Sequence, residues 1–243
     1  MTSKSDNLFH FTKSPEFVKG ILLNGFMPRY CLEDVEWIGI PDTKFFAYPM
    51  VCFCDIPLSR ISDHSDFFGS YGLGLTKNWG LKNRLAPAIY ATPGSAATKV
   101  WKYLFEQKFL DVDPDKKAKE DQQFSHLYQL MTLTKPISGN MVVAGKVVAK
   151  DFDQENEWRF VPEQGSVIDE KDFPAQKDAG NKLMESHKLS LAPTDVKYVF
   201  VKEDNEIPDI VDFVNTKMGH FPHNDLKILT SRIISLETIY KDL

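Results

Sequence analysis

The sequence lacks the features that mark secreted, membrane-spanning or disordered chains. Its 243 residues include three cysteines, an odd number, whereas a secreted chain of this size usually carries an even set. No apolar run approaches the ~20 residues that cross a bilayer, and the polar segment 1–7 has no hydrophobic signal core. The hydrophobic share of 42% is typical of globular proteins. We therefore expect a soluble, cytoplasmic globular protein that does not enter a membrane.

Common catalytic signatures are missing as well. The chain contains no His-Glu-x-x-His, Gly-x-Ser-x-Gly or Walker pattern, which disfavours zinc peptidase, α/β-hydrolase and P-loop chemistry. No glycine-rich phosphate loop follows a predicted strand, so a doubly wound nucleotide-binding fold is not expected. The net charge of −5 argues against a broad phosphate-binding surface, although it leaves a local nucleic-acid groove open.

The cysteines do not predict a metal site. Cys52 and Cys54 are two residues apart in a predicted strand, so they face the same side. A zinc site needs four ligands, and no second pair of cysteines or histidines stands at a matching spacing. We expect these thiols to be buried packing groups.

The N-terminal segment predicts a strand followed by a capped helix. Leu8–Thr12 alternates as a strand does, and Ser14 and Pro15 are typical of the N-cap and the first position of a helix. Asn24–Gly25 is a typical helix end.

The rest of the chain predicts one α+β domain over residues 1–243. We expect a mixed or antiparallel sheet, which can be split, flanked by helices. A helical insertion is expected around 96–135, broken by a loop at Asp111–Asp121, and a polar insertion around 163–190. The predicted strands are Met50–Cys54, opened by Pro49, and Tyr71–Thr76, Pro87–Thr92, Met141–Lys150, Glu157–Val161, Val196–Val201 and Leu226–Leu229; the predicted closing helices are Ile207–Met218 and Ser231–Tyr240.

The sharpest candidate site is a charged strand. Alternation places Glu155, Glu157 and Arg159 on one face. Two carboxylates about 7 Å apart on a strand can divide labour, one stabilising an oxocarbenium-like centre and the other orienting a nucleophile. Arg159 can keep a neighbour ionised or bind a phosphate. The alternative is a charge ladder on an exposed edge strand.

Other candidates are weaker. His10 shares a strand face with Thr12, where the two side chains can hydrogen-bond a ribose or phosphate; a hydrogen-bonded core histidine is the more frequent role. Tyr71, beside a glycine, can stack on a flat ring or simply pack. Asp55 is expected to cap a turn, and His64 lies in a predicted polar helix or loop. Asp55, His64 and Glu157 together suggest a third hypothesis, a metal-dependent nuclease.

Six sequence features, taken in order along the chain, form a recognisable series: Leu8-Phe-His-Phe-Thr12, Ile21-Leu-Leu-Asn-Gly-Phe26, Pro49-Met-Val-Cys-Phe-Cys-Asp-Ile-Pro-Leu-Ser59, His64, Tyr71-Gly-Leu-Gly-Leu-Thr-Lys-Asn-Trp79 and Glu155-Asn-Glu-Trp-Arg-Phe-Val-Pro162. This series resembles the AbiGi family of bacterial abortive-infection proteins. The resemblance implies phage resistance, the antitoxin half of a two-gene toxin–antitoxin system, and a partner protein from a neighbouring gene, with nucleic acid left open as a target.

A looser resemblance links the His-x-Thr strand and the Glu-x-Glu strand to ADP-ribosyltransferases such as the DarT toxins. It implies a transferase-like fold with NAD as co-substrate. His10, Thr12, Tyr71 and Arg159 would bind NAD, Glu157 would stabilise the transition state, and Glu155 would orient the acceptor. Two hypotheses stay open: an NAD-dependent enzyme, and an antitoxin that only binds its toxin.

Overall fold

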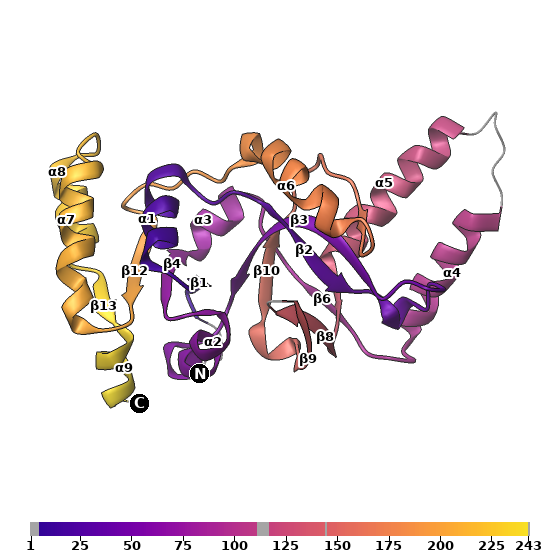
Figure 1. The fold of residues 1–243 in the computed structure, drawn as a ribbon, viewed down its shortest axis with the longest axis horizontal. Coiled ribbons are helices and arrows are strands. Elements are labelled where there is room, and N and C mark those ends of the chain that lie inside the picture. Colours follow the sequence, from indigo (N-terminus) through magenta and orange to yellow (C-terminus); the bar gives the residue numbers. More distant parts are fainter. Residues whose placement is uncertain (1–4, 111–116, 144, 243) are drawn as a thin grey trace. The chain divides into compact units, whose positions relative to one another are not determined.

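The computed structural model describes residues 5–110, 117–143 and 145–242 and shows a mixed α+β fold with helices flanking a mixed sheet (Figure 1). The chain forms two compact units. The first unit comprises Met1–Met27, Cys52–Leu85 and Lys188–Leu243, and the second comprises Pro28–Val51 and Ala86–His187. The single domain over residues 1–243 stays a prediction.

The sheet of the first unit runs in the order β13 (Ile233–Ser235), β12 (Val196–Val201), β4 (Tyr71–Thr76) and β1 (Asn7–Thr12). The pair β12–β13 is parallel, and the pairs β12–β4 and β1–β4 are antiparallel. The end of β3 (Phe45–Cys54) extends this sheet, with Cys54 opposite Phe9. The strands predicted at 8–12, 71–76 and 196–201 are thus confirmed.

Helix α1 (Pro15–Asn24) follows its sequence signals. The Ser14 hydroxyl accepts a hydrogen bond from the backbone N–H of Glu16, and Pro15 opens the helix. Gly25 ends it with a positive φ of 84°, and its N–H donates to the Ile21 carbonyl. A side chain at Gly25 would collide with the backbone of Leu189, so this position requires glycine for space as well as for conformation.

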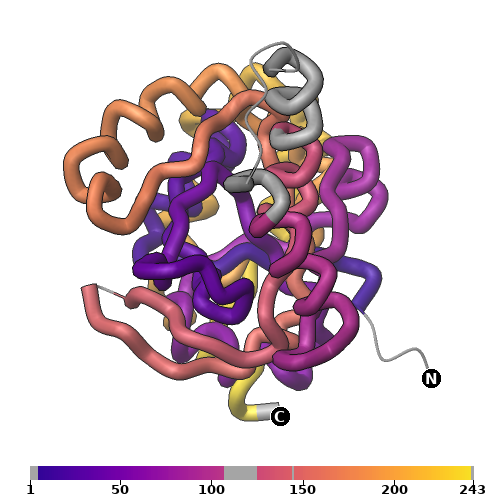
Figure 2. The backbone as a smooth tube through the Cα atoms, turned by 90° about the vertical axis from the view of Figure 1, so that its right-hand side faces the viewer, coloured from indigo at the N-terminus to yellow at the C-terminus, as the bar shows by residue number. Residues whose placement is uncertain are grey.

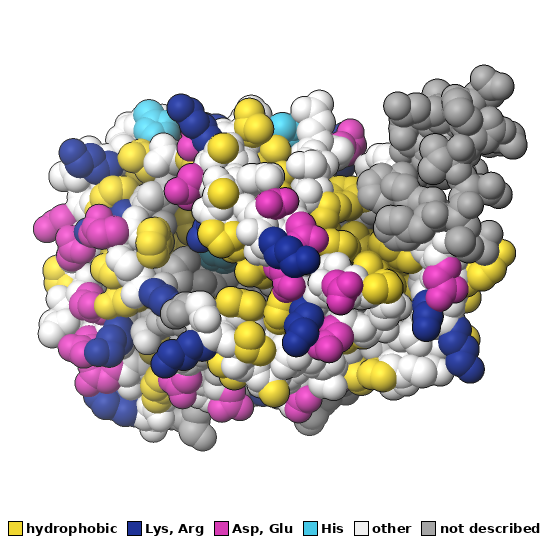
Figure 3. Space-filling model, turned by 45° about the vertical axis from the view of Figure 1, so that its right-hand side comes forward, with side chains coloured by type: hydrophobic (Ala, Val, Ile, Leu, Met, Phe, Trp, Pro, Cys, Tyr) yellow, Lys and Arg dark blue, Asp and Glu magenta, His cyan; other side chains and the backbone are white. Residues whose placement is uncertain are grey.

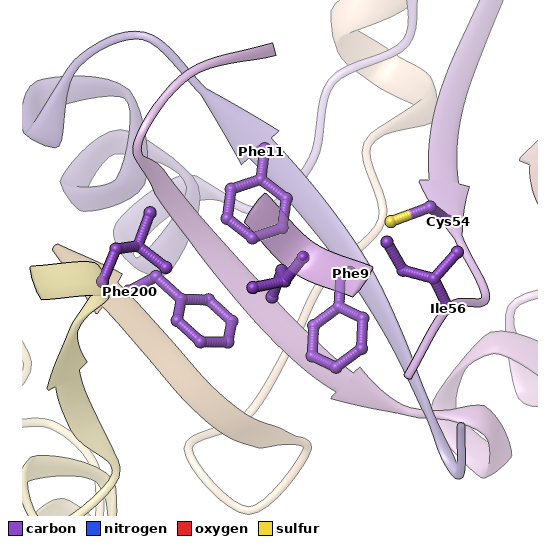
Figure 4. Packing of buried hydrophobic residues seen from close by; sticks show 7 residues of the cluster. Phe9, Phe11, Cys54, Ile56 and Phe200 are labelled. Carbon is purple, nitrogen blue, oxygen red and sulfur yellow. The ribbon is translucent and has the colours of Figure 1, made fainter. Parts of the chain in front are cut away.

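Alternation along β1 divides the core of the first unit between two faces. Phe9 and Phe11 pack on one face with Phe200 (Figure 4). His10 lies on the other face, with Phe26 and Phe53. The predicted alternation along this strand is confirmed.

The remaining helices of the first unit are α2 (Ile61–Phe68), α3 (Lys77–Lys82), α7 (Ile207–Lys217), α8 (His223–Thr230) and α9 (Leu236–Asp242). The strand predicted at Leu226–Leu229 is wrong, because this segment lies in α8, where Leu226 and Leu229 are buried at helical i, i+3 spacing. The helix predicted over Ser231–Tyr240 is also partly wrong: its first part is the short strand β13, which pairs with β12.

In the second unit the first part of β3 lies between two strands. β2 (Arg29–Asp34) and β11 (Ile168–Asp169) both pair with it antiparallel, and Leu32 and Ile168 both stand opposite Ala47. β3 begins at Phe45, and Pro49 lies within it, opposite Tyr30, rather than at its start. The second unit also holds β10 (Glu157–Phe160) with β5 (Ala86–Pro87), the parallel pair β6 (Ile89–Ala91) and β7 (Thr134–Pro136), and the antiparallel pair β8 (Ser138–Val143) and β9 (Lys146–Asp151).

The helices of the second unit are α4 (Ala96–Leu110), α5 (Lys117–Leu133) and α6 (Phe173–Leu183). The first two confirm the helical segment predicted around 96–135. Residues 111–116 of the predicted loop lie outside the described residues, and its remainder is helical from Lys117 onward. Within the described residues, the structure has no helix with the length and apolar character of a membrane span.

Candidate functional site

The strand β10 places two opposite charges on one buried face. Glu157 is 4% exposed and Arg159 is 1% exposed. The Arg159 guanidinium donates two hydrogen bonds to the Glu157 carboxylate, from Nε to Oε1 at 2.9 Å and from Nη2 to Oε2 at 3.0 Å. This fork-to-fork geometry is the strongest form of a charge-assisted hydrogen bond.

The other donors of Arg159 point to protein groups as well. Nη1 donates to the Thr132 carbonyl at 2.7 Å, and Nη2 approaches Oε2 of Glu33 at 2.5 Å. Arg159 is therefore held by a carboxylate on its own strand, a carboxylate on β2 and the end of α5. These contacts direct the guanidinium inward.

Lys135 on β7 adds a second buried cation. Its Nζ lies 3.0 Å from Oε2 of Glu157, 3.7 Å from Glu155 and 4.0 Å from Glu33. It also sits over the Phe152 ring, 4.2 Å from the centroid. Burial disfavours its charged form, but the carboxylates of Glu157 and then Glu33 outweigh burial and raise the pKa of Lys135.

Glu155 joins this cluster from outside the strand. It lies in the 3-10 turn Asp153–Glu155, and Asn156 follows with a left-handed φ of 46°, so β10 starts only at Glu157. The prediction that Glu155 shares one strand face with Glu157 and Arg159 is therefore wrong. Glu155 pairs with Lys150 of β9; burial raises the pKa of Glu155 and lowers that of Lys150.

Six charged side chains thus form what we call the ion network. They are Glu33, Glu155, Glu157, Lys135, Lys150 and Arg159. The three negative and three positive charges balance. The alternative of an exposed charge ladder is wrong too, because Glu155, Glu157 and Arg159 are buried.

The network resembles a structural core more than a reactive centre. A carboxylate that already accepts hydrogen bonds from a guanidinium is a weak base and a weak nucleophile, since its charge is stabilised. Across the described ranges, no group of three or more His, Cys, Asp or Glu side chains is arranged to hold a metal ion. Sequence reasoning missed Glu33, Lys135 and Lys150, because no local pattern sets them apart from other surface charges.

In the first unit, His10 makes the contacts of a core histidine. Its Nδ1 lies 2.8 Å from the Cys52 carbonyl, which can only accept, so Nδ1 carries the proton. The ring lies edge-on to Phe26, with centroids 5.1 Å apart. Burial lowers the pKa of His10, and the hydrogen bond to the carbonyl only partly opposes this shift.

Thr12 and Tyr71 stand directly opposite each other on β1 and β4, so they share the sheet face of His10. The Thr12 hydroxyl donates to the Ser14 carbonyl at 3.2 Å. The Tyr71 hydroxyl donates to Glu206 at 2.6 Å, while the other oxygen of Glu206 caps the turn before α7. Burial is the larger cause and the hydrogen bond to Glu206 the next one, and together they raise the pKa of Tyr71 to about 12.

The six predicted site residues therefore divide between the units. His10, Thr12 and Tyr71 belong to the first unit and gather on one face of its sheet. Glu155, Glu157 and Arg159 belong to the second unit and gather in the ion network.

Asp55 and His64, the other ligands of the nuclease hypothesis, have structural surroundings. Asp55 is 1% exposed and pairs with Lys77, with Oδ2 and Nζ 2.8 Å apart. His64 lies within α2, against Phe11 and Phe68. Cys54 packs with Phe9 and the other apolar residues of the first core, as predicted.

The comparison with known proteins identifies the class as abortive phage resistance. A family model described as "Putative abortive phage resistance protein AbiGi, antitoxin" matches residues 24–202. The chain is also similar to the abortive phage resistance protein AbiGi of Lactococcus lactis subsp. cremoris, at 26% identity over 89% of this chain and 99% of that protein. The chain belongs to the AbiGi family, which confirms the resemblance.

No solved structure matches the chain, so the ADP-ribosyltransferase-like fold stays a prediction. Figure 3 shows acidic and basic side chains intermingled on the face that it presents, without a large area of one sign.

Proposed function

We propose that this protein acts in phage defence as an antitoxin that neutralises a partner toxin by binding it, without turning over NAD. The antitoxin description of its family supports a binding role. The observation that carries the proposal is that Glu157, the side chain on which transferase chemistry would depend, is buried and paired with two cations. Its two oxygens accept from Arg159, one of them also meets Lys135, and 4% of the residue is exposed.

The physical reason lies in how a carboxylate stabilises a developing positive charge. It does so only if its own charge is available where the sugar cation forms. In Glu157 that charge is stabilised by two cations in a buried site, and any approach by a substrate would require these pairs to break. Breaking one partner out of a buried ion pair costs about 3–5 kcal/mol, which makes Glu157 a poor catalyst.

The transferase with NAD as co-substrate is the second candidate. The pairing of Thr12 with Tyr71, on the sheet face of His10, favours it, because it brings together three of the side chains expected to hold NAD. In this candidate Glu157 acts in catalysis, Glu155 orients the acceptor, and Arg159 holds a phosphate.

Two measurements separate the candidates. In the first, the chain is co-expressed with the product of the neighbouring gene, and growth is recorded for the wild type and for Thr12→Val. The antitoxin role predicts equal rescue by both proteins and a stable complex on purification. Toxicity that the wild type fails to relieve would refute it.

In the second measurement, NAD at millimolar concentration is added to the purified protein. The antitoxin role predicts an unchanged melting temperature and no release of nicotinamide. The transferase predicts a higher melting temperature, and release of nicotinamide that Thr12→Val weakens and Glu157→Gln abolishes. The melting temperature of each variant shows whether a loss of activity reflects unfolding.

A further inference from the structure

The hairpin of β8 and β9 is a two-stranded sheet of its own. Figure 2 shows its two strands running side by side. Within the described parts of the chain, no third strand pairs with either of them. The outer edge of β9 therefore presents alternate backbone N–H and C=O groups without a partner strand, which makes it a template for strand addition.

The side chains along β9 favour an extended apolar partner. Lys146, Val147, Val148 and Ala149 are all exposed, with 60% of Val147 and 39% of Val148 accessible. Consecutive strand residues point to opposite faces, so an added strand would meet one valine on each face. Lys146, at the beginning of β9, would face a residue near the end of an antiparallel partner strand.

The hairpin is anchored within the second unit in a way that fixes this edge. The backbone N–H of Asn140 donates to Oδ2 of Asp34 at 2.7 Å. Lys150 pairs with Glu155 of the ion network, and the N–H of Phe152 donates to the Ile137 carbonyl at 2.8 Å. A lone hairpin is marginally stable in water, so these contacts hold β9 ready to receive a strand.

The charge pattern of β9 argues against a second copy of this chain as the partner. Two identical antiparallel strands related by a two-fold axis place one residue opposite its own copy. With Val148 at that position, Lys146 faces Lys150 of the other copy, and like charges directly opposite are destabilising.

The two neighbouring registers also fail. With Ala149 at the axis, Val148 faces Lys150 and Val147 faces Asp151, so each valine meets a charge. With Val147 at the axis, Val148 faces Lys146. The fitting occupant is therefore a different chain, with apolar residues at the centre of its strand and a carboxylate at one end.

We propose that the outer edge of β9 receives an extended segment of the partner toxin as a third antiparallel strand, with apolar side chains beside Val147 and Val148 and an acidic side chain opposite Lys146. This inference rests on the proposed antitoxin function and assigns its binding surface. Main-chain hydrogen bonds would supply much of the affinity, and the valines and the lysine would supply selectivity, as in other cases of strand addition.

The test uses the full chain and the purified product of the neighbouring toxin gene. Val147→Lys places a charge in the middle of the edge, and we expect it to weaken binding at least tenfold. Leu183→Lys is the control, because Leu183 is also an exposed aliphatic residue of the same unit, on α6, with 71% accessible against 60% for Val147. The affinity of this variant for the toxin should equal that of the wild type. Melting temperatures confirm that both variants are folded.

Hydrogen exchange on the wild-type complex gives a second readout that needs no variant. Amides of Lys146–Asp151 that exchange rapidly in the free protein should become protected when the toxin binds. If the toxin binds without new protection in β9, or if Val147→Lys binds as tightly as Leu183→Lys, the assigned surface is wrong and the antitoxin function stands. If the wild type does not bind the toxin at all, both proposals are overturned.

Discussion

The two units bury different kinds of side chain. The core of the first unit is built on stacked and tilted aromatic rings, among them Phe9, Phe11 and Phe200. The buried Asp55 of this unit pairs with the partly exposed Lys77. The second unit buries Lys135, Arg159, Glu155 and Glu157 of the ion network. Both units thus have apolar cores, and the second unit adds a charge-balanced network of buried side chains.

The difference determines how each unit should respond to change. Apolar burial is non-directional and roughly proportional to area, so a substitution that keeps the volume costs little. A buried ion network depends on every member, because removing one leaves its partners charged, desolvated and uncompensated. The same balance supports the proposal that these charged residues, which resemble a catalytic strand in the sequence, serve the fold and not catalysis.

The largest expected effect comes from Arg159→Met. It keeps much of the side-chain volume but removes one of the two cations that pair with Glu157 and Glu33, and leaves them only Lys135. We expect a loss of roughly 3–5 kcal/mol in the free energy of unfolding, measured by urea denaturation. Combining it with Glu157→Gln should recover part of the loss, and a double variant as unstable as the sum of the two single variants would contradict charge balance as the cause.

A somewhat smaller loss is expected from Leu75→Ala in the first unit. Leu75 is fully buried on β4, so its truncation should cost about 3 kcal/mol through lost burial and a cavity. Leu75→Met, which conserves the volume, should cost less than about 1.5 kcal/mol. Equal losses of unfolding free energy in the two variants would show that this core does not tolerate even a substitution that conserves volume.

Mild acid should affect the two units with opposite signs. The pKa of His10 is lowered below 6.5, so the unfolded chain binds its proton more readily, and stability present above pH 6.5 is lost as the pH falls below it. The pKa of Glu155 is raised above 4.5 and that of Asp34 above 3.8. These carboxyls take up protons more readily in the folded state, so acidification favours the folded second unit.

Amide exchange at pH 7 and pH 5, corrected for intrinsic rates, measures this difference. Protection of β1 should fall, while protection of β10 should hold or rise. Glu155→Gln should remove part of the response of β10 and leave that of β1 unchanged. A parallel fall of protection in both strands would contradict this difference between the two units.

The smallest effect is expected for an exposed pair. Lys241 and Glu237 lie 2.9 Å apart on α9 with exposed side chains, and Lys241→Met should change the free energy of unfolding by less than about 0.5 kcal/mol. A change comparable to that of Arg159→Met would show that burial is not what separates the ion network from surface pairs.

Local signals in the sequence were sufficient for much of the fold. The strands at 8–12, 71–76 and 196–201 were predicted because alternation and composition act over a few residues. The start of α1 at Ser14 and Pro15 and its end at Gly25 follow from capping within one turn. The strand predicted at Leu226–Leu229 was wrong because this short segment was considered without the residues before it. Pro222 precedes a helix that begins at His223, and two leucines three residues apart fit that helix.

Strand alternation is a local property, so the sequence alone predicts that Glu157 and Arg159 share a face. The burial of this face depends on the tertiary fold, in which Glu33, 126 residues from Arg159, and Lys135, 22 residues from Glu157, complete the network. The left-handed backbone of Asn156 also places Glu155 outside the strand. Ion pairing acts through space and leaves no periodic trace in the sequence, so the same residues that predict a reactive strand form a neutral, buried ion network in the fold.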